Sequence, residues 1–222
     1  MDIISSHRNG LMQINTNSLS KELCKELIKL FEAENNKYGY DGITAGGMDK
    51  EIKNTTDMVI SKIPSWDKIT KLLNEEIQYN INEYMRNAGK RVMYQENDED
   101  EDEDENYWYM LSSPKLSIPA IQMQKYNKNE GKYIYHNDFS CNFDDRDMRQ
   151  ITFLWYINDV EEGGETEFGN DLKIKPTAGK LILFPSHWTF PHRANMPISG
   201  DKYIITGWLY EQYETNYPGF VK

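Results

Sequence analysis

Cysteine is scarce in this chain, with only Cys24 and Cys141 among 222 residues. Two cysteines cannot build the disulfide framework of a small secreted domain, which agrees with a reducing compartment. No apolar run approaches the roughly 20 residues needed to cross a bilayer, and the first residues lack the basic and apolar regions of a signal peptide. These absences predict a soluble, cytoplasmic protein that has no contact with a membrane.

Basic residues are also in deficit: 25 Lys and Arg stand against 36 Asp and Glu, for a formal charge of −11. Nine of the acidic residues fall in the run 96–105, so the rest of the chain is close to neutral. Like charges repel and stay solvated, which predicts an acidic surface loop at 96–106; a docking site for a basic partner is the alternative. Without clustered Lys and Arg, nothing indicates a nucleic-acid partner.

The first half of the chain carries two helical patterns. Apolar residues recur at three and four positions within 19–31, where Ser18 or Ser20 can cap the start, and again within 66–84. The intervening stretch 39–60 is rich in glycine and threonine, so it predicts one or two strands with a loop, and it is a candidate lid. We expect both helices to pack against a sheet.

Short strands separated by glycine turns dominate the second half. A chain of this length fits one domain, and strands preceded by helices predict an α+β, mainly β fold with a double-stranded β-helix (jelly-roll) core. Within the domain 1–222 we expect helical support and the lid at about 1–95, the acidic loop at about 96–106 and the core at about 107–213, with the N-terminal helices against one sheet. The expected strands are 115–126, 132–139, 151–158, 172–175, 180–184 and 202–213.

Histidine is rare too, and its positions are informative. Residues i and i+2 of a strand point to the same face, so His136 and Asp138 can present an imidazole and a carboxylate side by side. One distant histidine would complete the two-His, one-carboxylate set of non-haem Fe(II) oxygenases, which leaves the opposite metal positions open. His192, just before a strand-like segment, is the preferred third ligand, and His187, in an aromatic-rich loop, is the alternative.

A lysine follows ten residues after His192. On a strand, Lys202 shares its face with Thr206, Trp208 and Tyr210. A lysine pointing into a barrel would carry a large desolvation cost, which a dicarboxylate ligand would offset through charge-assisted hydrogen bonds. The alternative is a lysine at a strand end that points to water.

Five segments, in this order, resemble the prolyl 4-hydroxylase branch of the 2-oxoglutarate- and Fe(II)-dependent dioxygenases. The likeness covers roughly 122–209, and Lys53 to Thr56 is similar to a basic-x-Thr segment near the substrate groove of that family. One departure is the spacing of four residues between Tyr126 and Gly131, where the family commonly has two or three. The five segments are 126–138, 149–158, 162–168, 173–179 and 192–209.

The resemblance implies roles for individual residues. It implies Fe(II) at His136, Asp138 and His192, and a salt bridge from Lys202 to the far carboxylate of 2-oxoglutarate. It also implies that the Tyr126 hydroxyl reaches this cosubstrate. Further pocket-lining residues would be Thr152, Tyr156 and Trp208, and the candidate substrate contacts are Arg149, Tyr133 and Tyr210.

The same resemblance implies an activity. The expected reaction is hydroxylation of a protein or peptide, most of all peptidyl-proline at C4, with 2-oxoglutarate and O2 consumed, succinate and CO2 released, and ascorbate as a candidate reductant. A proline-rich substrate could bind as an extended polyproline II segment. Another protein residue, a small molecule, or a non-catalytic jelly-roll binding module are the alternatives. The sequence carries no signal for the oligomeric state.

Overall fold

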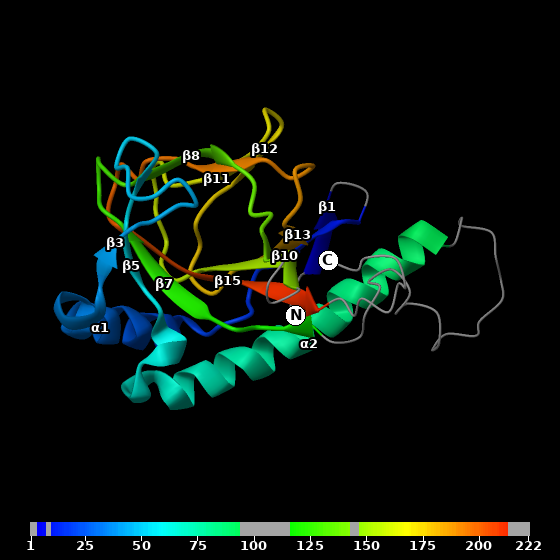
Figure 1. Cartoon of the computed structure of the whole chain (residues 1–222), viewed down its shortest axis with the longest axis horizontal. Helices are drawn as coiled ribbons and strands as arrows, with labels where there is room; N and C mark the ends of the chain where they lie inside the picture. The colour runs from blue at the N-terminus through cyan, green and yellow to red at the C-terminus, as the bar shows by residue number, and fades with distance from the viewer. Residues whose placement is uncertain (1–3, 8–9, 94–115, 143–146, 213–222) are drawn as a thin grey trace, which may run out of the picture.

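Two antiparallel sheets and two long helices make up the computed structural model, which describes residues 4–7, 10–93, 116–142 and 147–212. The expected acidic loop at 96–106 lies outside these residues. The helices run beneath the larger sheet, and the smaller sheet lies on its other side (Figure 1). Among the described residues, no helix is long and apolar enough to span a bilayer.

The larger sheet forms the centre of the molecule. Its order is β1-β2-β13-β10-β15-β7-β5-β3, and the short β6 and β9 pair with β15 and β10. The strands are β1 (Ile4–His7), β2 (Met12–Asn15), β3 (Tyr40–Asp41), β5 (Thr56–Met58), β6 (Leu116–Ser117), β7 (Ile121–Tyr126), β9 (Cys141–Asn142), β10 (Asp147–Tyr156), β13 (Leu181–Pro185) and β15 (Lys202–Gln212).

The smaller sheet has five short strands in the order β12-β11-β14-β8-β4. Of its three-residue strands, β12 was expected from the sequence, whereas β11 and β14 were not. The strands are β4 (Lys53–Asn54), β8 (Lys132–His136), β11 (Thr166–Phe168), β12 (Leu172–Ile174) and β14 (His192–Ala194).

Both predicted helices are present. Helix α1 (Lys21–Tyr38) begins where the Ser20 side chain accepts a hydrogen bond from the Leu23 backbone N–H at 3.1 Å, so Ser20 rather than Ser18 is the cap. Helix α2 (Asp67–Met93) follows two short 3₁₀ turns, Ile60–Lys62 and Pro64–Trp66. Both helices bury one face against the larger sheet, as the periodicity predicted.

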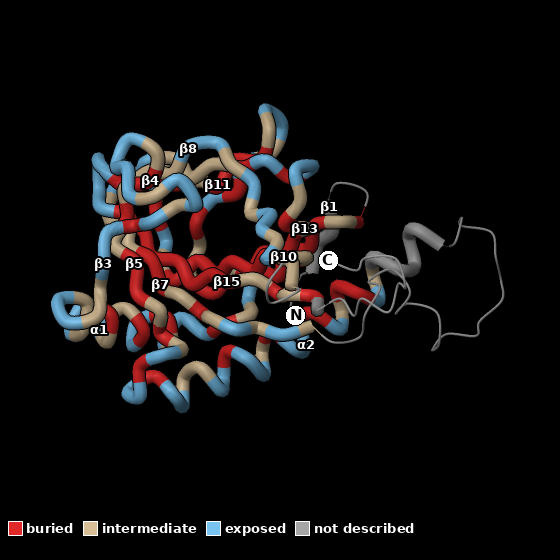
Figure 2. The backbone as a smooth tube through the Cα atoms, in the orientation of Figure 1, coloured by how far each residue is buried: buried red, intermediate tan, exposed pale blue. Residues whose placement is uncertain are grey.

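Two apolar clusters hold these layers together. The first lies between the helices and the larger sheet and includes Phe31, Trp66 and Trp155, all fully buried. The second lies between the two sheets around Phe168 and Phe184, whose rings meet edge to face at 4.9 Å. Buried backbone accordingly runs through the middle of β7, β10 and β15 (Figure 2).

Each of the six expected strands has a counterpart in the described residues. The stretch 115–126 is divided into β6 and β7 around Pro119, which has no N–H to donate to a ladder. The stretch 39–60 contains β3, β4 and β5, so it contributes to both sheets. It thereby connects the two layers on one side of the space between them.

Candidate functional site

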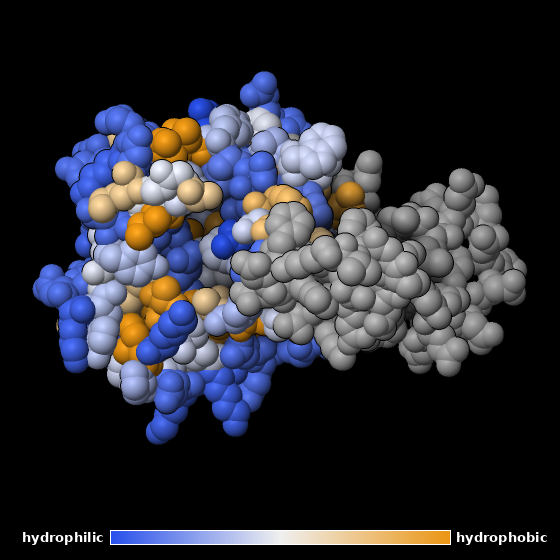
Figure 3. All heavy atoms as spheres, viewed as in Figure 1, coloured by the Kyte–Doolittle hydropathy of each residue, from blue (hydrophilic) through white to orange (hydrophobic). Residues whose placement is uncertain are grey.

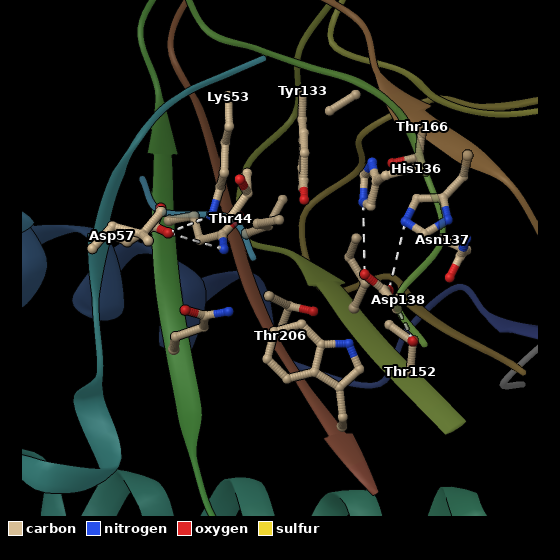
Figure 4. Close-up of a pocket in the computed structure, with 18 of the residues that line it drawn as sticks. Thr44, Lys53, Asp57, Tyr133, His136, Asn137, Asp138, Thr152, Thr166 and Thr206 are labelled. Carbon is tan, nitrogen blue, oxygen red and sulfur yellow. Dashed lines mark hydrogen bonds and ion pairs between the residues drawn. The ribbon is translucent and has the colours of Figure 1, made fainter. Parts of the chain in front are cut away.

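A cavity of about 590 Å³ lies between the two sheets. Its walls come from β8 and β14 of the smaller sheet, from β7, β10 and β15 of the larger one, and from residues 40–45 of the candidate lid. The side chains that converge on it are polar and titratable to an unusual degree (Figure 4). Such a combination marks a functional site.

Three of these side chains form a compact group of metal-ligand type. His136 is the last residue of β8, Asp138 follows two residues later, and His192 begins β14, where it pairs directly with His136. The Nε2 atoms of His136 and His192 lie 3.6 Å from Oδ1 and Oδ2 of Asp138 respectively (Figure 4). One ligand atom from each residue falls within 4.8 Å of the other two.

The histidine rings are oriented through their other nitrogens. Nδ1 of His136 lies 2.8 Å from the Ile134 carbonyl oxygen, and Nδ1 of His192 lies 3.0 Å from that of Phe190. A carbonyl can only accept, so each Nδ1 carries the proton and each Nε2 keeps its lone pair toward the shared space. Burial, together with the His192 charge, lowers the pKa of His136 to about 4, which keeps its ring neutral near pH 7.

Asp138 is kept ionised in part by a contact with the larger sheet. Burial alone would raise its pKa, but the nearby His192 and His136 and a hydrogen bond from Thr152 outweigh that effect and lower it. Thr152 Oγ1 on β10 donates to Asp138 Oδ2 at 2.9 Å and also contacts Ser186 Oγ at 2.9 Å. An ionised carboxylate beside two imidazole nitrogens is a donor set that suits Fe(II).

Lys202, at the start of β15, is a buried cation in the same cavity. It is 1% exposed, and its Nζ donates to the Gly164 carbonyl at 3.0 Å and lies 4.2 Å from the centre of the Tyr126 ring. No carboxylate of the described residues forms an ion pair with it, and burial lowers its pKa to about 7. A buried ammonium with spare donors fits a carboxylate ligand.

The predicted cosubstrate pocket residues fall into two groups. Tyr126, Thr152 and Trp208 line the cavity, as strand parity with Lys202 requires for Trp208. Tyr156 lies behind the wall, fully buried, with its hydroxyl 2.6 Å from Oγ1 of Thr166, and Thr166 lines the cavity in its place. The Tyr126 hydroxyl contacts Gln124 Oε1 at 3.1 Å.

The candidate substrate contacts surround the metal-ligand group. The Arg149 guanidinium lies 3.6 Å from the centre of the Trp208 ring, and its Nε donates to the Tyr210 hydroxyl at 2.8 Å. Tyr133 stacks on the His136 ring at 3.5 Å. Arg149 and Tyr133 line the cavity. Tyr210 does not line it but contacts Arg149, which does.

His187, the alternative third ligand, lies elsewhere. Its Nε2 is 2.9 Å from Gln150 Oε1, and its ring stacks on Phe139 at 5.3 Å. It does not belong to the group formed by His136, Asp138 and His192 in the described part of the chain. The geometry therefore favours His192 over His187.

A buried ion pair on the lid side of the cavity was not predicted from the sequence. Lys53 and Asp57 form a salt bridge at 2.5 Å, and Asp57 also accepts from Thr55 Oγ1 at 2.7 Å. Gln124 completes the set, since its Nε2 donates to Asp57 Oδ2 at 3.4 Å. Lys53 lines the cavity, in agreement with the predicted position of the basic-x-Thr segment. Only the alternation of Gln122, Gln124 and Tyr126 on β7 could have indicated this wall in advance.

Comparisons with known proteins agree with this geometry. Residues 121–210 match the model of the 2OG-Fe(II) oxygenase superfamily. Among solved structures, a prolyl hydroxylase from Trichoplax adhaerens, in complex with a hypoxia inducible factor oxygen degradation domain peptide fragment, has a TM-score of 0.64 at 20% identity, covering 90% of this chain and 84% of that one. The viral collagen prolyl hydroxylase of Paramecium Bursaria Chlorella virus-1 has a TM-score of 0.59 at 20% identity, covering 90% and 96%.

Sequence relatives point the same way over a shorter stretch. Prolyl 4-hydroxylase 13 of Arabidopsis thaliana is 33% identical where it matches, which is 29% of this chain and 32% of the relative. This chain therefore aligns with about a third of the length of that curated relative. The fold and the site resemble those of the 2-oxoglutarate/Fe(II) oxygenases. The likeness to the prolyl 4-hydroxylases, predicted from the sequence, is confirmed.

Proposed function

We propose that this chain is an Fe(II)- and 2-oxoglutarate-dependent dioxygenase that hydroxylates peptidyl-proline at C4. The observation that carries the proposal is the convergence of His136, Asp138 and His192 on one space, with the buried Lys202 ammonium in the same cavity. A structural barrel has no need for three metal-ligand groups together with a buried lysine that has no carboxylate partner among the described residues. We further propose that the two sheets form a double-stranded β-helix and that the chain acts as one domain.

The protein residues supply binding, orientation and exclusion of water. His136, Asp138 and His192 would hold Fe(II), and Lys202 would bind the far carboxylate of 2-oxoglutarate, next to the Tyr126 ring. When bound, iron and 2-oxoglutarate supply the oxidising chemistry that couples decarboxylation to succinate with transfer of one oxygen atom to a substrate C–H bond. No side-chain acid or base is required, and ascorbate would serve as the external reductant.

The substrate is proposed to enter between the lid segment and the metal-ligand group. Ile43 and Phe139 line the cavity yet remain 56% and 46% exposed, so they belong to its rim. Apolar patches are separated by hydrophilic residues on the face shown in Figure 3. A proline-containing peptide in an extended conformation suits such a rim, with Tyr133 and Arg149 inside it as contacts. A peptide-bound neighbour of similar fold is consistent with this mode.

The test is turnover with a peptide panel. The chain would be incubated with Fe(II), 2-oxoglutarate, O2 and ascorbate, and with proline-containing peptides matched to alanine-substituted controls. We expect succinate release and a mass gain of one oxygen atom at proline alone. Succinate release with a product on another residue or on a small molecule would redirect the substrate assignment. Absence of Fe(II) binding by the wild-type chain would contradict the whole proposal.

A further inference from the structure

A second polar cluster lies on β11, away from the cavity. Its centre is Glu167, which is 4% exposed although it is ionisable. Arg193 NH2 donates to both carboxylate oxygens, at 2.9 and 3.0 Å. The Tyr135 hydroxyl lies 2.8 Å from Oε1, and Asn195 Nδ2 lies 3.2 Å from Oε2. Lys173 Nζ completes the set at 3.2 Å from Oε2.

The partners of Glu167 are chain neighbours of the metal-ligand histidines. Tyr135 immediately precedes His136 on β8, and Arg193 immediately follows His192 on β14. The Arg193 guanidinium also lies 4.9 Å from the centre of the Tyr135 ring. One carboxylate on β11 thus contacts both strands that carry the imidazoles.

The strand pairing is irregular at this point. His192 pairs with His136, but Ala194 pairs with Tyr133, so β8 places two residues opposite the single Arg193. This is the pattern of a β-bulge, which bends a strand and changes the direction of the adjacent side chains. Within the bulge the Ile134 backbone N–H donates to the Ile52 carbonyl at 3.0 Å, and side-chain contacts add to this bond. The Tyr135 hydroxyl lies 2.8 Å from Glu167 Oε1 and 2.5 Å from the Gly169 carbonyl oxygen, two acceptors that share its one hydrogen.

We propose that Glu167 is a positioning residue that holds the β8 bulge against β14 and so sets the separation and direction of the His136 and His192 imidazoles. This inference rests on the proposed function, because those imidazoles are taken as Fe(II) ligands. The proposed role of Glu167 differs from that of the hydrogen bonds made by the ring Nδ1 atoms, because each of those bonds orients one ring. Glu167 acts on the pair by fixing the two strands relative to each other.

The carboxylate is suited to this task because it stays charged. Burial would raise the pKa of Glu167, but the hydrogen bonds from Arg193, Asn195, Tyr135 and Lys173 lower it to about 2. The cluster therefore keeps its charge-assisted hydrogen bonds across the neutral pH range. Such contacts fix a strand more firmly than neutral ones.

The experiment measures metal affinity rather than turnover. Binding of Co(II), as an oxygen-stable probe for the Fe(II) site, would be titrated calorimetrically into the full chain and into two variants, Glu167→Gln and Tyr135→Phe. Tyr135→Phe removes only the hydroxyl that joins the bulge to Glu167 and Gly169, on a residue that is 40% exposed, so the fold should survive. Lys173→Met is the matched control, since Lys173 contacts Glu167 from β12 and does not contact the bulge.

We expect Glu167→Gln to weaken Co(II) binding by roughly 10-fold or more, within the range of roughly 10–100-fold for residues that orient metal ligands. Tyr135→Phe should weaken it by about 5-fold, and Lys173→Met should leave it unchanged. Co(II) affinities of Tyr135→Phe equal to wild type would overturn the inference, even if Glu167→Gln failed to fold. Equal losses in Lys173→Met would also overturn it. A wild-type chain that bound no Co(II) would instead remove the proposed function together with this inference.

Discussion

At the scale of single residues, the site depends on the protonation states of three side chains, His136, Asp138 and Lys202. The His136 imidazole is neutral because burial opposes its charge, and Asp138 is ionised because its neighbours outweigh burial. Lys202 is the exception, since its pKa of about 7 places it between its two forms near neutral pH. The affinity of a ligand that binds the ammonium form must therefore depend on pH in this range.

The first prediction concerns the metal ligands. Alanine at His136 or Asp138 removes one of three donors, so we expect Co(II) or Fe(II) binding to weaken by at least two orders of magnitude and turnover to be lost. Calorimetry and succinate release would measure the two effects. His187→Ala is the matched control, because His187 lies outside the group. Wild-type rates of 2-oxoglutarate decarboxylation in either ligand variant would contradict the assignment.

The second prediction concerns Lys202 and pH. Binding of 2-oxoglutarate requires the ammonium, and the free chain must take up a proton to supply it above pH 7, so the KM for 2-oxoglutarate should rise as pH increases from 7 to 9. The rise should approach roughly 10-fold per pH unit at the upper end, by proton linkage. Lys202→Met should raise this KM by about 10- to 100-fold, since a charged hydrogen bond contributes about 1.5–3 kcal/mol. A KM that is independent of pH, or unchanged in Lys202→Met, would contradict this role.

The same shift has a consequence for stability. The folded-state pKa of Lys202 lies below its ordinary value of 10.5, so the unfolded chain binds more protons between about pH 7 and that value. Burial of Lys202 is therefore unfavourable below pH 7, and this cost decreases as pH rises through the window. Within the unliganded protein, stability from this residue should increase with pH while cosubstrate affinity decreases.

At the scale of elements, the layers are joined by buried polar contacts as well as by apolar clusters. Asn80 on α2 is fully buried, donates to the Glu76 backbone carbonyl at 2.9 Å and accepts from Asn15 Nδ2 on β2 at 2.8 Å. The bond to Asn15 fixes the rotation of the helix beneath the larger sheet, while the bond to Glu76 lies within the helix. The apolar face alone would permit sliding, because burial of apolar area is not directional.

The third prediction tests that attachment. Asn80→Ala would leave Asn15 on β2 buried without its partner, so we expect the free energy of unfolding to fall by about 2 kcal/mol. Urea denaturation followed by circular dichroism would measure it. Asn82→Ala is the matched control, since Asn82 on the same helix is exposed and accepts from Gln78, a neighbour on that helix. An Asn80 variant as stable as the Asn82 variant would show that the helix is held by apolar contacts alone.

At the scale of the whole molecule, a ligand bound in the cavity would link the stability of the two sheets. Its walls come from both sheets and from the lid segment, so a bound metal and dicarboxylate would contact all of them. Ligands that bind only the folded chain stabilise it by mass action.

The fourth prediction follows from this coupling. Co(II) with 2-oxoglutarate, each at about 100 times its dissociation constant, should stabilise the fold by several kcal/mol, given about 2.7 kcal/mol for one such ligand. For a chain of this size, at about 2–4 °C per kcal/mol, the Tm should rise by roughly 10–20 °C. Differential scanning fluorimetry would measure the rise, and a chelator should reverse it. His136→Ala should show little of it, and a wild-type Tm unaffected by saturating ligands would contradict the site.

Much of the architecture was available from the sequence because strand and helix periodicities are local. Alternation placed Lys202, Thr206 and Trp208 on one face of β15, and all three line the cavity. Spacing by two placed His136 beside Asp138. The helical repeats predicted α1 and α2 and their packing against a sheet, which is the larger sheet.

Other features are decided only by the tertiary structure. His192 rather than His187 joins the metal-ligand group because β14 pairs with β8. Tyr156 lies behind Thr166, outside the cavity wall, because β10 packs against β11 and β12. The positioning role proposed for Glu167 depends on its contacts with Arg193 and Tyr135, which come together only when the three strands pair. A sequence pattern fixes the direction of a side chain relative to its own strand, whereas the partner across the sheet depends on long-range pairing that no local period encodes.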